Sequence, residues 1–95
     1  MMKIIYVESA YRDLDWYRKY YAVVFPAGRK NAAKHYMDAV TNLQQNPMIG
    51  QAIEGTSARK LVINRTPFTI IYRVYQNEIR VYRVLDGCAK PHEIA

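Results

Sequence analysis

Residues 58–87 are ARKLVINRTPFTIIYRVYQNEIRVYRVLDG, and two runs within them alternate like β-strands. The runs cover residues 69–75 and 78–85, and β-branched and aromatic residues dominate both. The polar pair Gln76 and Asn77 between them predicts a short turn, and a third run precedes them at residues 59–63. The sequence therefore predicts a meander of three antiparallel strands, with the upstream chain covering one of its faces.

The alternation sorts the side chains of the meander onto two faces. With the turn at Gln76 and Asn77, Val74 lies opposite Ile79, and Ile70 lies opposite Arg83. One face then carries almost only apolar and aromatic residues, which we predict as the core. They are Leu61, Ile63, Phe68, Ile70, Tyr72, Val74, Ile79 and Val81.

The opposite face is predicted to be open, and it mixes apolar with basic side chains. Its members are Lys60, Val62, Thr69, Ile71, Arg73, Arg80, Tyr82 and Val84. Arg73 lies directly across from Arg80, and a like-charge pair of this kind costs roughly 0.2–1 kcal/mol. An acidic group from another molecule would relieve that cost. The alternative is that both guanidinium groups extend into water while their stems cover Ile71 and Tyr82.

Upstream of the meander, residues 3–7 predict a short fourth strand. Ser9 is a predicted N-cap for a helix beginning at Ala10, and Asp13 then falls in the first turn, where the helix dipole favours an acidic residue. Apolar and aromatic residues recur at steps of three and four along this helix, which indicates an amphipathic helix. We assign its crowded aromatic rings to core packing.

A second helix follows a break at residues 25–28 and ends at Asn46, because the residue before Pro47 is disfavoured in helical geometry. A loop this short makes the two helices an antiparallel hairpin. The predicted fold class is α+β in two layers. The N-terminal strand and the helical hairpin pack on one face of an antiparallel sheet that ends in the three-stranded meander.

The length and net charge of the chain narrow down its domain organisation and the kind of partner it binds. Its 95 residues predict one domain spanning residues 1–95 with a single modest core. The net charge of +6 favours an acidic partner. The one cysteine, Cys88, cannot form an intrachain disulfide, and no apolar run is long enough for a membrane span or a signal peptide. We therefore expect a cytoplasmic protein with no membrane partner.

Catalytic chemistry has few candidates in this sequence. Cys88, His35 and His92 match no metal-ligand spacing, and the chain has no glycine-rich phosphate loop or nucleophile motif, so no metal or other cofactor is expected. A metal-free ribonuclease would need an acid, a base and cations. The cations are abundant in the C-terminal half, but the only acid–base candidates nearby, Asp86, His92 and Glu93, lie in or beside a tail with no clear pattern.

Several short motifs occur in a characteristic order along nearly the whole chain. They are residues 10–14, Asn46-Pro47 followed by Gly50, Arg59-Lys60-Leu61, the strand IIYRV at 70–74, and Ile79 through Arg83-Val84-Leu85 to Gly87. Together they resemble the RelE/ParE toxin superfamily. The resemblance implies a toxin of a bacterial type II toxin–antitoxin operon, silenced by an antitoxin whose C-terminal segment wraps the toxin.

RelE-like members of that superfamily cut messenger RNA on the ribosome with basic residues, two arginines and a C-terminal tyrosine. The matching positions here are Lys60, Val62, Thr69, Ala89 and Ala95, and only Lys60 keeps the required residue type. Loss of the arginines and the tyrosine removes both charge stabilisation and the acid–base group. The resemblance thus argues against the nuclease activity.

ParE-like members lack the nuclease set and inhibit DNA gyrase instead. The IIYRV strand and the ending at residues 83–87 resemble this branch more closely. The branch often continues with histidine, glycine, alanine and arginine, whereas this chain has Asp86-Gly87-Cys88-Ala89-Lys90. Lys90 would then replace the arginine one position later.

We therefore expect a non-catalytic ParE-like toxin that inhibits gyrase by protein–protein contact. An acidic, amphipathic antitoxin segment is expected to cover Lys60, Val62, Ile71, Arg73, Arg80, Tyr82 and Val84, and gyrase is expected to contact Arg83, Lys90 and His92. No direct, specific nucleic-acid binding is expected. Two alternatives stay open: a RelE-like ribosome-dependent mRNA endonuclease, and an inactive toxin retained as an antitoxin-binding module.

Overall fold

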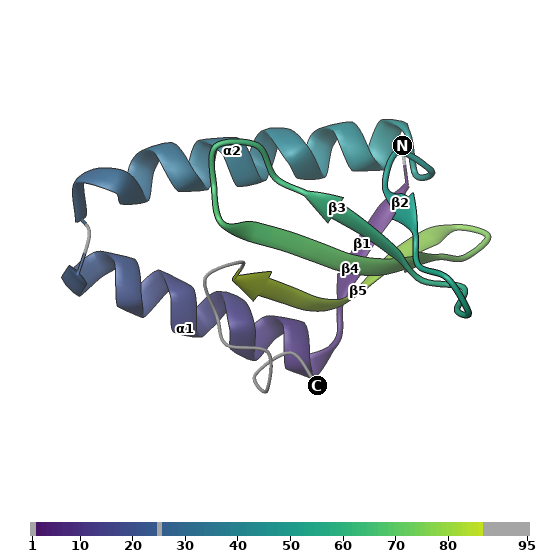
Figure 1. The fold of residues 1–95 in the computed structure, drawn as a ribbon, viewed down its shortest axis with the longest axis horizontal. Coiled ribbons are helices and arrows are strands. Elements are labelled where there is room, and N and C mark those ends of the chain that lie inside the picture. Colours follow the sequence, from purple (N-terminus) through teal and green to yellow (C-terminus); the bar gives the residue numbers. More distant parts are fainter. Residues whose placement is uncertain (1, 25, 87–95) are drawn as a thin grey trace.

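The computed structural model describes residues 2–24 and 26–86, which form a helical hairpin packed on a five-stranded sheet (Figure 1). The helices are α1 (Glu8–Val24) and α2 (Pro26–Gln45). The strands are β1 (Lys3–Tyr6), β2 (Gln51–Ala52), β3 (Arg59–Val62), β4 (Phe68–Val74) and β5 (Glu78–Asp86). The predicted α+β class and the antiparallel meander β3-β4-β5 are confirmed.

The sheet is mixed, which corrects the prediction of a wholly antiparallel one. Its strand order is β1-β5-β4-β3-β2, and β1 runs parallel to β5 with Ile4 opposite Ile79. A parallel neighbour requires a long crossover, and the chain from α1 to β4 supplies it. The second departure is β2, a two-residue strand beside β3 that is too short for alternation to predict.

The core lies between the helices and one face of the sheet, as predicted. Six of the predicted core side chains are buried, while Leu61 and Val74 are partly buried against them. The six are Ile63, Phe68, Ile70, Tyr72, Ile79 and Val81. The helices contribute Ala10, Val40 and Leu43 to the same cluster.

A β-bulge between β4 and β5 changes which residues of β5 face the core. Tyr72 pairs with Val81 and Ile71 pairs with Arg83, so Tyr82 is the extra residue. The predicted pairing of Ile70 with Arg83 is therefore wrong, because Ile70 lies opposite Val84. The placement of Val84 on the open face is wrong for the same reason, and its side chain is 0% exposed.

The first helix begins two residues earlier than predicted, so Ser9 lies inside its first turn and is not the N-cap. The amide of Tyr11 donates to the carbonyl of Val7, which precedes the helix. Asp13 therefore lies beyond the first turn. Its carboxylate binds Arg83 and the amide of Val84 on β5.

Tyr72 ties the loop after α2 to the middle of the sheet. Its hydroxyl donates to the carbonyl of Pro47 at 2.8 Å and accepts from the amide of Gly50 at 2.9 Å. A Cβ on Gly50 would lie 2.5 Å from this hydroxyl and 2.9 Å from the carbonyl oxygen of Lys60. Only glycine fits here, which explains the glycine that follows Asn46-Pro47 in this part of the chain.

Candidate functional site

The sheet face that points away from the helices carries the predicted partner-binding residues. The register places Lys60 opposite Ile71, Val62 opposite Thr69, and Arg73 opposite Arg80, so these side chains share one side of the sheet. We call this side the open face, defined by Lys60, Val62, Ile71, Arg73, Arg80 and Tyr82. Lys60, Val62, Arg73 and Arg80 are exposed, whereas Ile71 and Tyr82 are half-buried.

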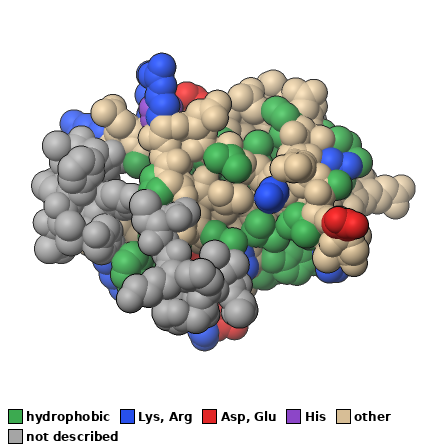
Figure 2. Space-filling view, in the orientation of Figure 1, with side chains coloured by type: hydrophobic (Ala, Val, Ile, Leu, Met, Phe, Trp, Pro, Cys, Tyr) green, Lys and Arg blue, Asp and Glu red, His purple; other side chains and the backbone are tan. Residues whose placement is uncertain are grey.

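Apolar and cationic groups meet on this face. Val62 is 60% exposed even though it lies in a strand, and Ile71 lies beside it on the neighbouring strand. Three cations share this side of the sheet: Lys60 lies opposite Ile71, and Arg73 lies opposite Arg80. The space-filling view in Figure 2 shows hydrophobic side chains beside isolated Lys and Arg side chains on one face of the molecule.

Arg73 and Arg80 lie directly opposite each other, and each guanidinium is placed over an aromatic ring of the other strand. Arg80 lies 4.3 Å from the ring centroid of Tyr75, and Arg73 lies 5.4 Å from that of Tyr82. The two phenol hydroxyls are hydrogen-bonded at 2.7 Å. We call these four residues the tyrosine–arginine cluster.

The cluster explains how the chain tolerates the like-charge pair. Each guanidinium gains a cation–π contact, and Arg80 also donates its Nε to the Glu78 carboxylate at 2.5 Å. The guanidinium groups thus have partners within the chain, and the pairing alone does not require an acidic partner. A partner is favoured instead by the exposed apolar side chains combined with an excess of positive charge.

The electrostatics of the cluster distinguish its two tyrosines. The hydrogen bond from Tyr82 lowers the pKa of Tyr75, and the guanidiniums of Arg73 and Arg80 lower it further. The same hydrogen bond raises the pKa of Tyr82, which keeps its proton longer. The Glu78 carboxylate raises the pKa of Arg80. The cluster therefore holds an exposed phenol that ionises more readily than free tyrosine, between two cations.

Arg83, predicted to contact the target, has a partner within the fold. Its Nε donates to Oδ2 of Asp13 at 2.8 Å and its Nη2 donates to Oδ1 at 3.1 Å. The same carboxylate accepts the amide of Val84 at 2.9 Å. Lys90 and His92, the other two predicted target-contacting residues, lie outside the described residues.

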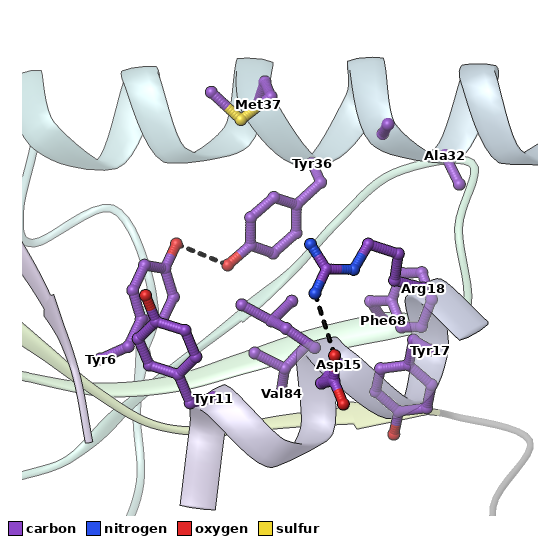
Figure 3. A pocket seen from close by; sticks show the side chains of 12 residues that line it. Tyr6, Tyr11, Asp15, Tyr17, Arg18, Ala32, Tyr36, Met37, Phe68 and Val84 are labelled. Carbon is purple, nitrogen blue, oxygen red and sulfur yellow. Dashed lines mark hydrogen bonds and ion pairs between the residues drawn. The ribbon is translucent and has the colours of Figure 1, made fainter. Parts of the chain in front are cut away.

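A groove between the two helices is a second surface feature, and the sequence did not reveal it (Figure 3). It encloses about 550 Å³ and is walled mainly by apolar and aromatic side chains. Tyr6 from β1 and Tyr36 from α2 are joined there by their hydroxyls at 2.7 Å, and Tyr17 packs on Phe68 with centroids 4.8 Å apart. Tyr11, on the rim, is 66% exposed, so the helix rings are not all core residues.

Two residues beside the open face escaped the sequence-based prediction. Tyr75 belongs to the tyrosine–arginine cluster, and Glu78 accepts a hydrogen bond from Arg80 of that cluster. Both follow the same two-residue alternation as Arg73 and Arg80, so the signal was present in the sequence. Both residues lie at the turn ends of the predicted runs 69–75 and 78–85, but the prediction did not assign either of them to the open face.

The comparisons with known proteins agree with the arrangement of these elements. The family model described as the ParE toxin of the type II toxin–antitoxin system parDE matches residues 4–88. A solved structure titled "Chromosomal ParDE TA system from P. aeruginosa" is 30% identical, with a TM-score of 0.75 over 90% of this chain and 96% of that one.

A structure titled "The structure of YoeB dimer from Staphylococcus aureus" shares the fold. It is 16% identical, with a TM-score of 0.57 over 86% of this chain and 92% of that one. No curated protein matches the sequence. Over residues 2–24 and 26–86, no helix is long and apolar enough to cross a bilayer.

Proposed function

The chain belongs to the ParE toxin family of type II toxin–antitoxin systems, and on this premise we propose that it arrests replication by binding DNA gyrase. In the same proposal, a cognate antitoxin silences it by laying an acidic, amphipathic segment over the open face. The observation that carries the proposal is the open face, where exposed Val62 and half-buried Ile71 lie among Lys60, Arg73 and Arg80. Both events would take place in the cytoplasm.

The composition of the open face supports an amphipathic partner. Scattered exposed apolar residues are ordinary on a protein surface, but Val62 and Ile71 lie on neighbouring strands of a face that also carries Lys60, Arg73 and Arg80. A partner segment with apolar and acidic side chains would bury the first group and neutralise the second. Tyr82 supplies further apolar area on the same side.

Charge reversal tests the antitoxin surface. The double variant Arg73→Glu with Arg80→Glu should bind the antitoxin at least tenfold more weakly, because two attractive contacts become repulsive. The matched control is Lys30→Glu with Lys34→Glu, which makes the same charge change at exposed positions of α2. Calorimetric titration with the antitoxin gives both affinities. Equal affinities for the two double variants would place the contact elsewhere.

Gyrase inhibition needs a separate experiment, because antitoxin binding does not identify a target. Purified toxin should inhibit DNA supercoiling by gyrase at micromolar concentration, and added antitoxin should restore the reaction. Absence of inhibition by folded toxin would remove gyrase as the target.

A second candidate function, cleavage of messenger RNA, is favoured by one observation. Tyr75 is an exposed phenol of lowered pKa between two guanidiniums, and such a group can exchange protons while the cations stabilise phosphorane charge. Toxin added to a translation reaction would then shorten the message, and Tyr75→Phe would abolish the cutting. Intact messenger RNA excludes this candidate.

A toxin that causes no growth arrest when induced without antitoxin would be a binding module only.

A further inference from the structure

The tyrosine–arginine cluster has an internal symmetry that a solvated charge pair would lack. Arg73 of β4 lies over Tyr82 of β5, Arg80 of β5 lies over Tyr75, the residue that follows β4, and the two phenol hydroxyls are 2.7 Å apart. Each guanidinium is therefore held on its own ring. The cluster presents two cationic positions on either side of a tyrosine pair.

The guanidiniums keep donors for a ligand. An arginine carries five N–H donors, and within residues 2–24 and 26–86 Arg80 donates its Nε to Glu78. A planar guanidinium fixed over a ring loses less conformational entropy on binding than a free one, so the cluster is preorganised. Carboxylates match the fork of such a group in a bidentate manner.

We propose that the tyrosine–arginine cluster is the element of the open face that recognises two carboxylates of the antitoxin segment, one at each guanidinium. This inference rests on the proposed antitoxin partner. In it, Arg73 and Arg80 are the contacting residues. Tyr75 and Tyr82 are positioning residues, which act by holding the guanidiniums apart and in place.

The surroundings favour peptide carboxylates over the phosphates of a nucleic acid. Ile71 and Val62 continue the same face beyond Arg73, and a peptide can cover them with apolar side chains while a phosphate backbone cannot. Glu78 beside Arg80 also lowers the local positive charge, which disfavours a polyanion more than a single carboxylate. The ligand is thus an acidic peptide segment whose acidic residues flank the tyrosine pair.

Double-mutant cycles with the antitoxin encoded beside the toxin gene test the two-site arrangement. Arg73→Gln and Arg80→Gln should each weaken binding about tenfold, since a charge-assisted hydrogen bond is lost in each. Each should also show coupling to a different Asp or Glu of the antitoxin, changed to Asn or Gln. Coupling of both arginines to one carboxylate, or to none, would overturn the proposal.

The pH dependence of antitoxin binding tests the positioning role of the tyrosines, because a purely structural role would not change it. The affinity for the antitoxin should fall as pH rises through the ionisation of Tyr75, because a phenolate adds negative charge beside the bound carboxylates. The titratable and charged groups that face the Tyr75 hydroxyl are Arg73, Arg80, Tyr82 and Glu78. Tyr75→Phe keeps the ring under Arg80 and should abolish that pH dependence. Tyr75→Leu removes the ring and should weaken binding at neutral pH. A flat profile for the wild type, or an unchanged one in Tyr75→Phe, would contradict this role.

Controls separate the failure of this inference from that of the proposed function. Thermal unfolding of each variant shows whether the fold is intact, and Lys34→Gln controls for the loss of one positive charge. Wild-type toxin that does not bind the antitoxin would remove the proposed function itself. Wild-type toxin that binds while Arg73→Gln and Arg80→Gln bind equally well would remove this inference alone. Arginine-dependent capture of single-stranded oligonucleotides with no carboxylate coupling would replace it with phosphate recognition.

Discussion

Asp13 of α1 and Arg83 of β5 lie 70 residues apart in the sequence and are joined by two hydrogen bonds of 2.8 and 3.1 Å. β1 pairs with β5 only as far as Val81, and beyond that residue α1 lies beside β5. The Asp13 carboxylate there accepts the amide of Val84. A helix side chain thus replaces the strand that would otherwise satisfy this amide.

Removal of the Asp13 carboxylate should cost about 2 kcal/mol or more, because it leaves Arg83 and the Val84 amide without their partner. Urea unfolding of Asp13→Ala measures the loss. The control is Asp15→Ala on the same helix, whose pairs with Arg18 and Lys19 are solvent-exposed and should contribute much less to stability. Equal losses for the two variants would mean that the link to β5 contributes no special stability.

Gly50→Ala should destabilise the fold by about 1–3 kcal/mol, because the new Cβ overlaps the Tyr72 hydroxyl. In a Tyr72→Phe background the hydroxyl is absent, so the added cost of the alanine should shrink. A double-mutant cycle by urea unfolding measures this coupling. Gly55→Ala is the contrasting variant, since Gly55 has a φ of 80° but no atom within 4 Å of its Cβ position. Additive effects at residues 50 and 72 would contradict the contact.

Stability should decline at alkaline pH because several tyrosines are held in the neutral form. Burial raises the pKa of Tyr17 to about 12, and burial also raises the pKa of Tyr6 and of Tyr36. Above pH 10 the unfolded chain releases these protons while the native chain keeps them. The free energy of unfolding therefore falls as pH rises from 10 toward 12, by less than about 1.4 kcal/mol per pH unit for each of these partly buried groups.

Unfolding measured across that pH range, with Tyr36→Phe as the comparison, checks the origin of the decline. The variant should lose less stability per pH unit than the wild type, because it has one fewer proton to release. Equal slopes would show that Tyr36 titrates alike in the folded and unfolded states.

Val62 and Val84 form a matched pair within the surface predicted from the sequence. Val84→Ala should cost about 2 kcal/mol, because its side chain is fully buried, and should leave antitoxin affinity unchanged in the folded protein. Val62→Ala should change stability by less than about 0.5 kcal/mol and weaken antitoxin binding. Urea unfolding and calorimetric titration of both variants distinguish the two roles. The opposite pattern would place the bulge elsewhere on β5.

Alternation along residues 69–75 and 78–81 determined most of the fold, because a strand with one buried face must alternate. Ile70, Tyr72, Ile79 and Val81 could therefore be assigned to the core without coordinates. The like-charge pair of Arg73 and Arg80 followed from the same register. Both depend only on neighbours in a hairpin, which the sequence specifies locally.

Tertiary structure alone decided the features that depend on distant parts of the chain. The bulge at Tyr82 returned Val84 to the core, and nothing in the local alternation distinguishes a bulged strand from a regular one. The position of β1 beside β5 and the link between Asp13 and Arg83 depend on how the helical hairpin packs against the sheet. The placement of each guanidinium over a ring also depends on three-dimensional geometry, because sequence supplies residue types and spacing but not side-chain direction.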